Sequence, residues 1–170
     1  MVACILSGWL AGGNVDRYIV QFPFWKWLGA LSWAEYNRYA DLDNGIIFYS
    51  FEAIGSFVFL LASSVMIMSN SKILKHGWWQ VHLATTFSAI GLILTFFADP
   101  VVISLKTLND TALLHNAFDR FYYWPLYRAV AQVLSFFFCA WSMAKGIITH
   151  SNSATSRVDY AREMYRDIIG

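Results

Sequence analysis

The chain has 170 residues, of which 58% are hydrophobic, 18% are aromatic and only 14% are charged. Soluble domains carry about 25% charged residues, so this composition excludes an ordinary soluble protein, and the mean hydropathy of +0.46 agrees with that exclusion. The formal net charge of +1, without a long basic run, argues against a nucleic-acid partner.

Four apolar segments follow one another along the chain, each long enough for a bilayer crossing, which needs about 20 residues. The last three are apolar on nearly every face, whereas a soluble helix would show a polar stripe. We therefore predict an all-α integral membrane four-helix bundle over residues 1–150, in contact with the lipid bilayer of a plasma or inner membrane. The segments run from Val2 to Gln21, Gly45 to Met68, Trp79 to Leu105 and Tyr123 to Ile148.

Lysine and arginine in the short loops predict the orientation. The segment from Ser69 to Gly77 carries Lys72 and Lys75 and no acid, and the tail after Ile148 carries three arginines, so both regions are expected on the cytoplasmic side. The N- and C-termini are then both cytoplasmic. Residues 151–170 have the pattern of a short amphipathic helix at the membrane surface.

The stretch "FPFWKWLGALSW" is predicted as an interfacial aromatic loop on the outer side. Its Trp25, Trp27 and Trp33 suit the headgroup level, where tryptophan is enriched.

Ionisable residues lie at similar depth in the outer half of all four segments. They are Asp16 and Arg17 in the first segment, Glu52 in the second, Asp99 in the third and Arg128 in the fourth, with Gln132 one turn deeper. A charge inside a membrane helix costs a few kcal/mol, so we expect these side chains to meet inside the bundle rather than face lipid.

Two hypotheses fit such a cluster. Arg17 and Arg128 can each hold a carboxylate, which leaves one acid over that could act as a general base or proton carrier. Alternatively, the charges form an ion network that only fixes the register of the helices.

Other polar residues give weaker indications of chemistry. His82, with Gln80, could contact haem or quinone, but an interfacial hydrogen bond is the more common role. His115 and Asp119 could join acids in a metal site, although the chain has no Glu-x-x-His pair, and no metal or organic cofactor is predicted. Cys4 and Cys139 lack CxxC spacing and are expected to be packing thiols.

The segments "AGGNVDRYIVQFP", "WAEYNRYADLDNGIIFYSFEAIGS" and "FDRFYYWPLYRAVAQVLSFF" resemble the anthrone oxygenase-like family of small four-helix membrane proteins. The resemblance runs from about Gly8 to Met143. It includes Trp124 and Arg128 at the start of the last helix, and an acid and proline, Asp99 and Pro100, at the end of the third. The chain departs from the pattern at Asp119 and Arg120 and in its charged first helix.

The resemblance implies an oxidoreductase, an oxygenase that oxidises a hydrophobic anthrone-like or polycyclic phenolic molecule with dioxygen. In that hypothesis Glu52 or Asp99 removes a proton, and Arg17 and Arg128 stabilise the enolate oxygen. The residues expected to contact the substrate are Asp16, Tyr49, Trp124, Tyr127 and Gln132. The alternative is a non-catalytic accessory subunit packed against other subunits of a respiratory or photosynthetic membrane complex.

Overall fold

A computed structural model describes the backbone of residues 1–69 and 78–169, and the side chains of these residues except 44, 46, 78 and 150–169. The described part is helical and has no strands. Its elements are α1 (Val2–Asp16), the π-helical η1 (Arg17–Gln21), α2 (Phe22–Leu28), α3 (Ala30–Tyr39), the π-helical η2 (Ala40–Gly45), α4 (Ile46–Ser69), α5 (Trp78–Ser104), α6 (Thr111–Phe121) and α7 (Trp124–Ile169).

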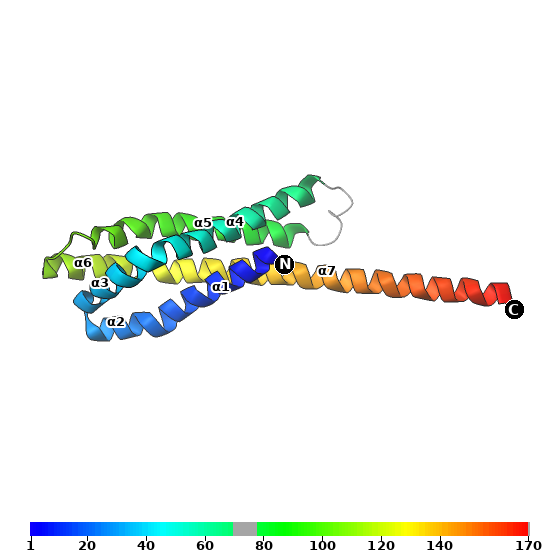
Figure 1. The fold of residues 1–170 in the computed structure, drawn as a ribbon, viewed down its shortest axis with the longest axis horizontal. Helices are drawn as coiled ribbons and strands as arrows, with labels where there is room; N and C mark the ends of the chain where they lie inside the picture. Colours follow the sequence, from blue (N-terminus) through cyan, green and yellow to red (C-terminus); the bar gives the residue numbers. More distant parts are fainter. Residues whose placement is uncertain (70–77, 170) are drawn as a thin grey trace.

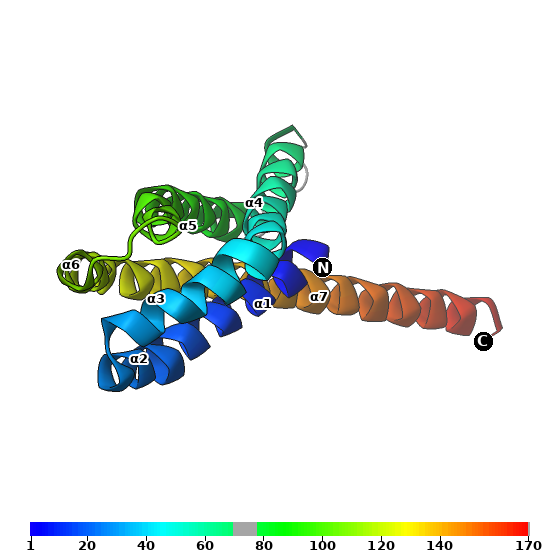
Figure 2. The same ribbon diagram turned by 60° about the vertical axis from the view of Figure 1, so that its left-hand side comes forward.

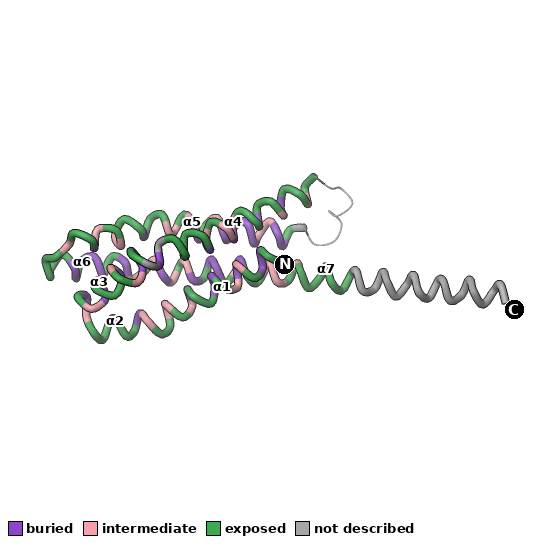
Figure 3. The backbone as a smooth tube through the Cα atoms, in the orientation of Figure 1, coloured by how far each residue is buried: buried purple, intermediate pink, exposed green. Residues whose placement is uncertain are grey.

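Three stretches of the described chain are long and apolar enough to cross a membrane: Ile47–Ser69, Trp79–Ser104 and Thr111–Thr149. They correspond to α4, α5 and the region of α6 and α7, so the prediction of apolar helices long enough to span a membrane is confirmed for these segments. Only 22%, 17% and 17% of their apolar windows are buried, which means that lipid or other apolar surface must cover the rest. Figure 3 shows this exposed surface along the outside of the helices.

The first predicted segment differs from the other three. α1 has 15 residues and is not among the three candidate spans. The chain stays helical beyond it, because η1 and α2 follow without a break as far as Leu28. The helix predicted to end near Gln21 therefore extends further.

α1, α4, α5 and α7 lie alongside one another. α5 packs against α7, α7 against α1, α1 against α4 and α4 against α5, so each helix has two of the others as neighbours. Figures 1 and 2 show α4 diverging from the other helices at the end near residue 69.

Neighbouring helices in this group run antiparallel. Between α1 and α4, Ser7 contacts Ser56 while Trp9 contacts Phe48. The same reversal relates α4 to α5, through the pairs Ser64–His82 and Leu60–Thr85. It relates α5 to α7 through Trp79–Trp141 and Phe97–Trp124. It also relates α1 to α7 through Asn14–Arg128 and Gly8–Phe136.

The region predicted as an interfacial aromatic loop is helical, which corrects that expectation. α2 and α3 meet at Gly29, whose φ of 93° is a left-handed conformation that favours glycine. The turn folds the two helices so that Trp25 and Trp33 are buried, with exposed fractions of 2% and 0%, whereas Trp27 is 79% exposed. Only Trp27 of the three is therefore free to lie among headgroups.

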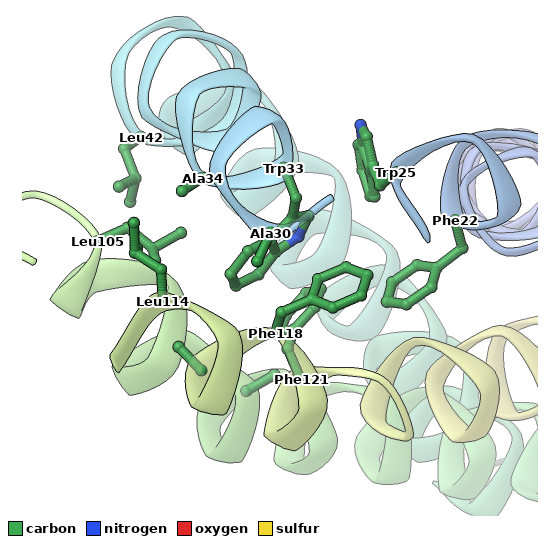
Figure 4. Packing of buried hydrophobic residues seen from close by; sticks show 12 residues of the cluster. Phe22, Trp25, Ala30, Trp33, Ala34, Leu42, Leu105, Leu114, Phe118 and Phe121 are labelled. Carbon is green, nitrogen blue, oxygen red and sulfur yellow. The ribbon is translucent and has the colours of Figure 1, made fainter. Parts of the chain in front are cut away.

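The buried tryptophans belong to an aromatic cluster that closes one end of the molecule (Figure 4). Phe22 stacks on Phe118 with ring centroids 5.8 Å apart, and Trp33 meets Phe118 edge to face at 5.2 Å. Arg38 also ties α3 to the end of α5, since its Nε donates to the carbonyl of Leu105 at 2.7 Å. These contacts hold α2 and α3 against α6 and the end of α5.

The last helix is longer than predicted. α7 runs without a break from Trp124 to Ile169, and Figure 1 shows it extending past the N-terminus, so the backbone has no interruption at residue 150. The amphipathic face predicted for residues 151–170, and the lysines of the 70–77 segment, lie outside the described side chains.

Candidate functional site

Arg17 forms an ion pair with an acid that the sequence analysis did not select. Its Nη2 lies 2.6 Å from Oδ1 of Asp41, and the two side chains are only 11% and 8% exposed. Both residues come from π-helical segments, Arg17 from η1 and Asp41 from η2. Such segments are frequent at functional sites. The ring of Tyr49 lies 5.2 Å from the Arg17 guanidinium carbon, a cation–π contact.

Asp16 does not join this group. It is exposed and accepts a hydrogen bond at 2.8 Å from Nε2 of Gln21, one turn further along the same helical stretch. Adjacent residues of a helix point about 100° apart, so the inward position of Arg17 directs Asp16 outward.

Arg128 is held by an amide rather than by a carboxylate. Its Nε donates to Oδ1 of Asn14 at 2.7 Å, and Asn14 in turn donates from Nδ2 to the carbonyl of Leu10 at 2.8 Å. That second bond orients the amide so that its oxygen faces Arg128. Arg17, Asp41, Asp99 and Tyr49 lie within electrostatic range of Arg128.

Asp99 lies on the outer surface of α5, next to Pro100. It is exposed, yet close enough to Arg128 for the two charges to interact. Within the described chain, neither Asp99 nor Glu52 forms an ion pair shorter than 4 Å with Arg17 or Arg128. The predicted cluster therefore divides into an arginine group near the aromatic end and a separate acid, Glu52.

Glu52 is buried inside the helix group, with an exposed fraction of 4%. Its Oε1 has no hydrogen-bond partner among the described residues. One turn further along α4, Ser56 Oγ lies 2.8 Å from Ser7 Oγ of α1. Because α1 and α4 are antiparallel, Glu52 is level with Ala11, one turn after Ser7.

Gln132 lies at the same level on α7. It follows Arg128 by one turn, and Arg128 is bonded to Asn14, so the antiparallel packing of α1 and α7 places Gln132 level with Leu10. Gln132 is 2% exposed and its Oε1 has no partner in the described chain. Its amide lies against Gly91 of α5, where an added Cβ would approach Nε2 to 2.2 Å.

Glu52 and Gln132 thus form a buried polar level, one turn inward from Arg128, with two oxygens that lack hydrogen-bond partners in the part of the chain that the structure describes. Buried polar atoms are nearly always hydrogen-bonded, so two such atoms at one level are unusual. Of these two residues, the sequence analysis expected Glu52 as a base and Gln132 as a substrate contact.

The predicted aromatic contacts are more exposed. Tyr127 is 55% exposed and Tyr49 is 43% exposed, while Trp124 is partly buried and stacks on Phe97 with ring centroids 6.0 Å apart. Tyr127 and Phe97 therefore present ring surface to the outside of the helices, near Asp99.

Tyr36 of α3 is a further phenol beside the arginine group, outside the three candidate spans. Burial raises the pKa of its hydroxyl above the usual value, and the positive charge of Arg17 partly offsets that increase.

The remaining candidates lie elsewhere. His82 is hydrogen-bonded through Nδ1 to Ser64 Oγ near the start of α5, and His115 is exposed on α6. No group of three or more His, Cys, Asp or Glu side chains in the described residues could hold a metal ion.

Two residues that position the arginines, Asn14 and Asp41, were missed by the sequence analysis. Asn14 follows two glycines and has no charge, and Asp41 lies between the first two predicted apolar segments. A signal was present for Asp41, since it lies about one turn before an apolar segment that begins near Gly45.

Comparison with known proteins adds no family to these observations: no family model, no curated protein and no solved structure matches the chain.

Proposed function

We propose that this chain is a membrane oxygenase in which Glu52 removes a weakly acidic proton from an anthrone-like or polycyclic phenolic substrate. The observation that carries the proposal is the buried Glu52 carboxyl group, whose Oε1 has no hydrogen-bond partner among the described residues, while both arginines are held by other residues. A network that only fixed helix register would use this acid as a counter-ion for an arginine. Ionisable residues inside membranes that lack such a partner are commonly functional.

The arginines have a second role in this proposal. Deprotonation of an anthrone spreads negative charge onto its carbonyl oxygen, and a guanidinium near that oxygen stabilises the enolate. Arg128 lies one turn outward from the level of Glu52. Arg17 lies within electrostatic range of Arg128. The amide of Gln132 is level with Glu52 and is proposed to position the substrate.

The overall reaction balances with dioxygen as the only oxidant. Glu52 accepts one proton from the substrate methylene carbon, and the carbanion gives up electrons to dioxygen. One oxygen atom forms the new carbonyl group, and the other leaves as water with the two hydrogens of the methylene group.

The membrane arrangement proposed for this enzyme has four crossings. Val2 to Leu28 is helical over 27 residues, about 40 Å at 1.5 Å per residue, which is enough to cross a hydrocarbon core of about 30 Å. With α4, α5 and α7 as the other crossings, the N- and C-termini lie together on the cytoplasmic side. The exposed rings of Tyr127 and Phe97 then face the bilayer, from which a hydrophobic substrate would enter.

The test is turnover of anthrone by the purified protein in lipid nanodiscs. We expect dioxygen consumption and quinone absorbance to appear together, and Glu52→Gln to lower the rate about 10²- to 10⁴-fold, the usual contribution of a general base. Glu35→Gln is the matched control, because Glu35 is exposed on α3. Empty nanodiscs measure the spontaneous oxidation.

Two results would reject this function. Equal rates for Glu52→Gln and the wild type would remove Glu52 as the base. Inactivity of the wild type, together with co-purification at fixed stoichiometry with a larger membrane complex, would favour an accessory subunit instead.

A further inference from the structure

Both cysteines of the chain lie at one contact between α1 and α7. Cys4 is in the first turn of α1 and Cys139 is in α7, and the sequence contains no other cysteine. Their side chains are hydrogen-bonded to each other, thiol to thiol, and both are free of disulfides. Two thiols that lie near opposite ends of the sequence are therefore in direct contact.

The packing of α1 on α7 accounts for this contact. Gly8 lies against the ring of Phe136, to which an added Cβ would approach within 2.9 Å. Cys4 is four residues before Gly8 in α1. Cys139 is three residues after Phe136 in α7. Since the two helices are antiparallel, both thiols lie one turn from that contact, on the same side of it. Cys139 also packs against the buried cluster that contains Ala3, the neighbour of Cys4.

Close packing alone gives no reason for two thiols to meet. A cysteine that only packs behaves as a small hydrophobic residue, a role that Ala3 and Ala11 fill elsewhere in α1. Facing thiols have a chemistry that facing alanines lack, because they can be joined by a covalent bond. The structure places the sulfur atoms where such a bond needs little movement, since a disulfide brings hydrogen-bonded thiols to about 2.05 Å.

The pair lies near the end of the helical group where α5 begins. Trp79 meets Trp141, two residues after Cys139, edge to face with ring centroids 5.4 Å apart. Nζ of Lys145, one turn further, lies 5.4 Å from the centre of the Trp141 ring. Tryptophan and lysine together are typical of the boundary between hydrocarbon and headgroups. In the proposed membrane arrangement the thiols are close to the cytoplasmic surface, within reach of a small uncharged oxidant.

We propose that Cys4 and Cys139 are a peroxide-sensitive thiol pair that forms a reversible disulfide between α1 and α7. The pair lies two turns of α1 away from the level of Glu52, and the proposed oxygenase reaction does not use it. Disulfides that form in the cytosol are usually transient and redox-sensing, because cellular thiols reduce them again.

The oxidation balances with hydrogen peroxide as the oxidant. The sulfur of Cys139, the more exposed of the two, attacks the peroxide, the O–O bond breaks, and the products are a sulfenic acid and one water molecule. The sulfur of Cys4 then displaces hydroxide from the sulfenic acid, and the S–S bond forms. The hydroxide takes up the Cys4 proton and leaves as a second water molecule. The thiols lose two electrons in total, and the peroxide oxygens gain them.

The test is a thiol titration of the purified full chain in nanodiscs that hold one copy each. Treatment with hydrogen peroxide should remove both free thiols without forming a dimer, and dithiothreitol should restore them. In a digest of the oxidised protein, the peptide with Cys4 should be joined to the peptide with Cys139. The mass of the joined species should be lower than the sum of the two peptides by two hydrogen atoms.

The chain offers a matched control for the position of the thiol. Cys4→Ser/Ile5→Cys keeps two thiols but moves one of them about 100° around α1, to a position that is 58% exposed. It should give no cross-linked peptide. In Cys4→Ser the sulfenic acid of Cys139 has no thiol to react with, so dimedone should trap more of it than in the wild type. Circular dichroism checks that these variants fold.

The wild-type result decides even if a variant fails to fold. Retention of both thiols at a peroxide concentration that oxidises glutathione would overturn the proposal. Oxidation of both cysteines to sulfinic acids without a cross-link would overturn it as well. An equal yield of cross-link in Cys4→Ser/Ile5→Cys would show that the contact at Cys4 does not select the partner, which also contradicts the proposal.

Discussion

At the scale of single residues, neither arginine binds one of the acids that were predicted to lie at the same depth in the other helices. Arg17 pairs with Asp41 and Arg128 binds Asn14, whereas Glu52 and Asp99 are left outside these contacts. A pairing based on depth alone assumes that all inward charges meet. The structure instead separates the arginines from the acid at the level of Glu52, which is the arrangement a base requires.

Asp41→Asn is expected to lower the free energy of unfolding by roughly 3 kcal/mol, because it leaves the buried Arg17 guanidinium without its counter-ion. Asp16→Asn is the matched control and should change it by less than about 0.5 kcal/mol, since Asp16 is exposed. Reversible unfolding in mixed detergent micelles measures both. The double variant Arg17→Met/Asp41→Leu should recover most of the lost free energy of unfolding, because it leaves no unpaired charge. If this double variant loses as much stability as Asp41→Asn, the unpaired charge is not the cause.

These residue-scale contacts show where sequence reasoning reaches its limit. Sequence analysis selected Glu52, Arg17 and Arg128 because a charged residue within an apolar segment can be recognised from the sequence alone. Asn14 carries no charge, and Asp41 is brought to Arg17 only by the helical course of residues 22–45, of which residues 22–33 were predicted as a loop. The ion pair therefore depends on a tertiary arrangement that periodicity does not encode.

At the scale of elements, the apolar lengths of α4, α5 and α7 were predictable because a bilayer crossing needs a long run of hydrophobic residues. The α2–α3 hairpin was not, since the pattern of "FPFWKWLGALSW" suits either a membrane surface or a protein interior. Trp33 packs against Phe118 and Phe121 of α6, more than 70 residues away in the sequence, and Trp25 belongs to the same buried cluster. Contacts between residues so far apart in the sequence cannot be predicted from local sequence patterns.

The contact between α5 and α7 gives a prediction for Gly91. A methyl group there would come within 2.2 Å of Nε2 and 3.0 Å of Cδ of Gln132, so Gly91→Ala should displace the amide and cost about 1 to 3 kcal/mol of stability. Gly12→Ala is the control, because nothing lies within 4 Å of its added Cβ. It should leave stability unchanged or raise it by up to about 1 kcal/mol, the helix propensity that alanine gains over glycine.

A double-mutant cycle isolates the clash between Gly91→Ala and the Gln132 side chain. In a Gln132→Ala background the amide is gone, so Gly91→Ala should cost less than it does in the wild type. An equal cost in both backgrounds would show that Gln132 does not occupy the space beside Gly91. Anthrone turnover of Gly91→Ala, measured in parallel, reports whether displacement of the amide also disturbs the proposed site.

At the scale of the whole molecule, the number of membrane crossings depends on α1. Three stretches have the length and hydropathy to cross, and α1 alone, with 15 residues, does not. Yet α1 packs between α4 and α7, with antiparallel contacts to α4 at Ser7 and Trp9 and to α7 from Gly8 to Asn14. In the proposed arrangement α1 enters the bilayer beside α4 and α7, and Asp41 neutralises Arg17, which directly follows α1.

This arrangement predicts which residues share a face of the membrane. In a Cys4→Ser/Cys139→Ser background, single cysteines at Val2 and Ser69 should react with a membrane-impermeant maleimide from one side, and cysteines at Lys26 and Lys106 from the other; all four positions are exposed. In the proposed orientation the Val2 side is the cytoplasmic side. Labelling of the Val2 and Lys26 cysteines from the same side would show that α1 does not cross. In that case the level shared by Glu52 and Gln132 would be open along the α1 side, and a water-excluded base could not be maintained there.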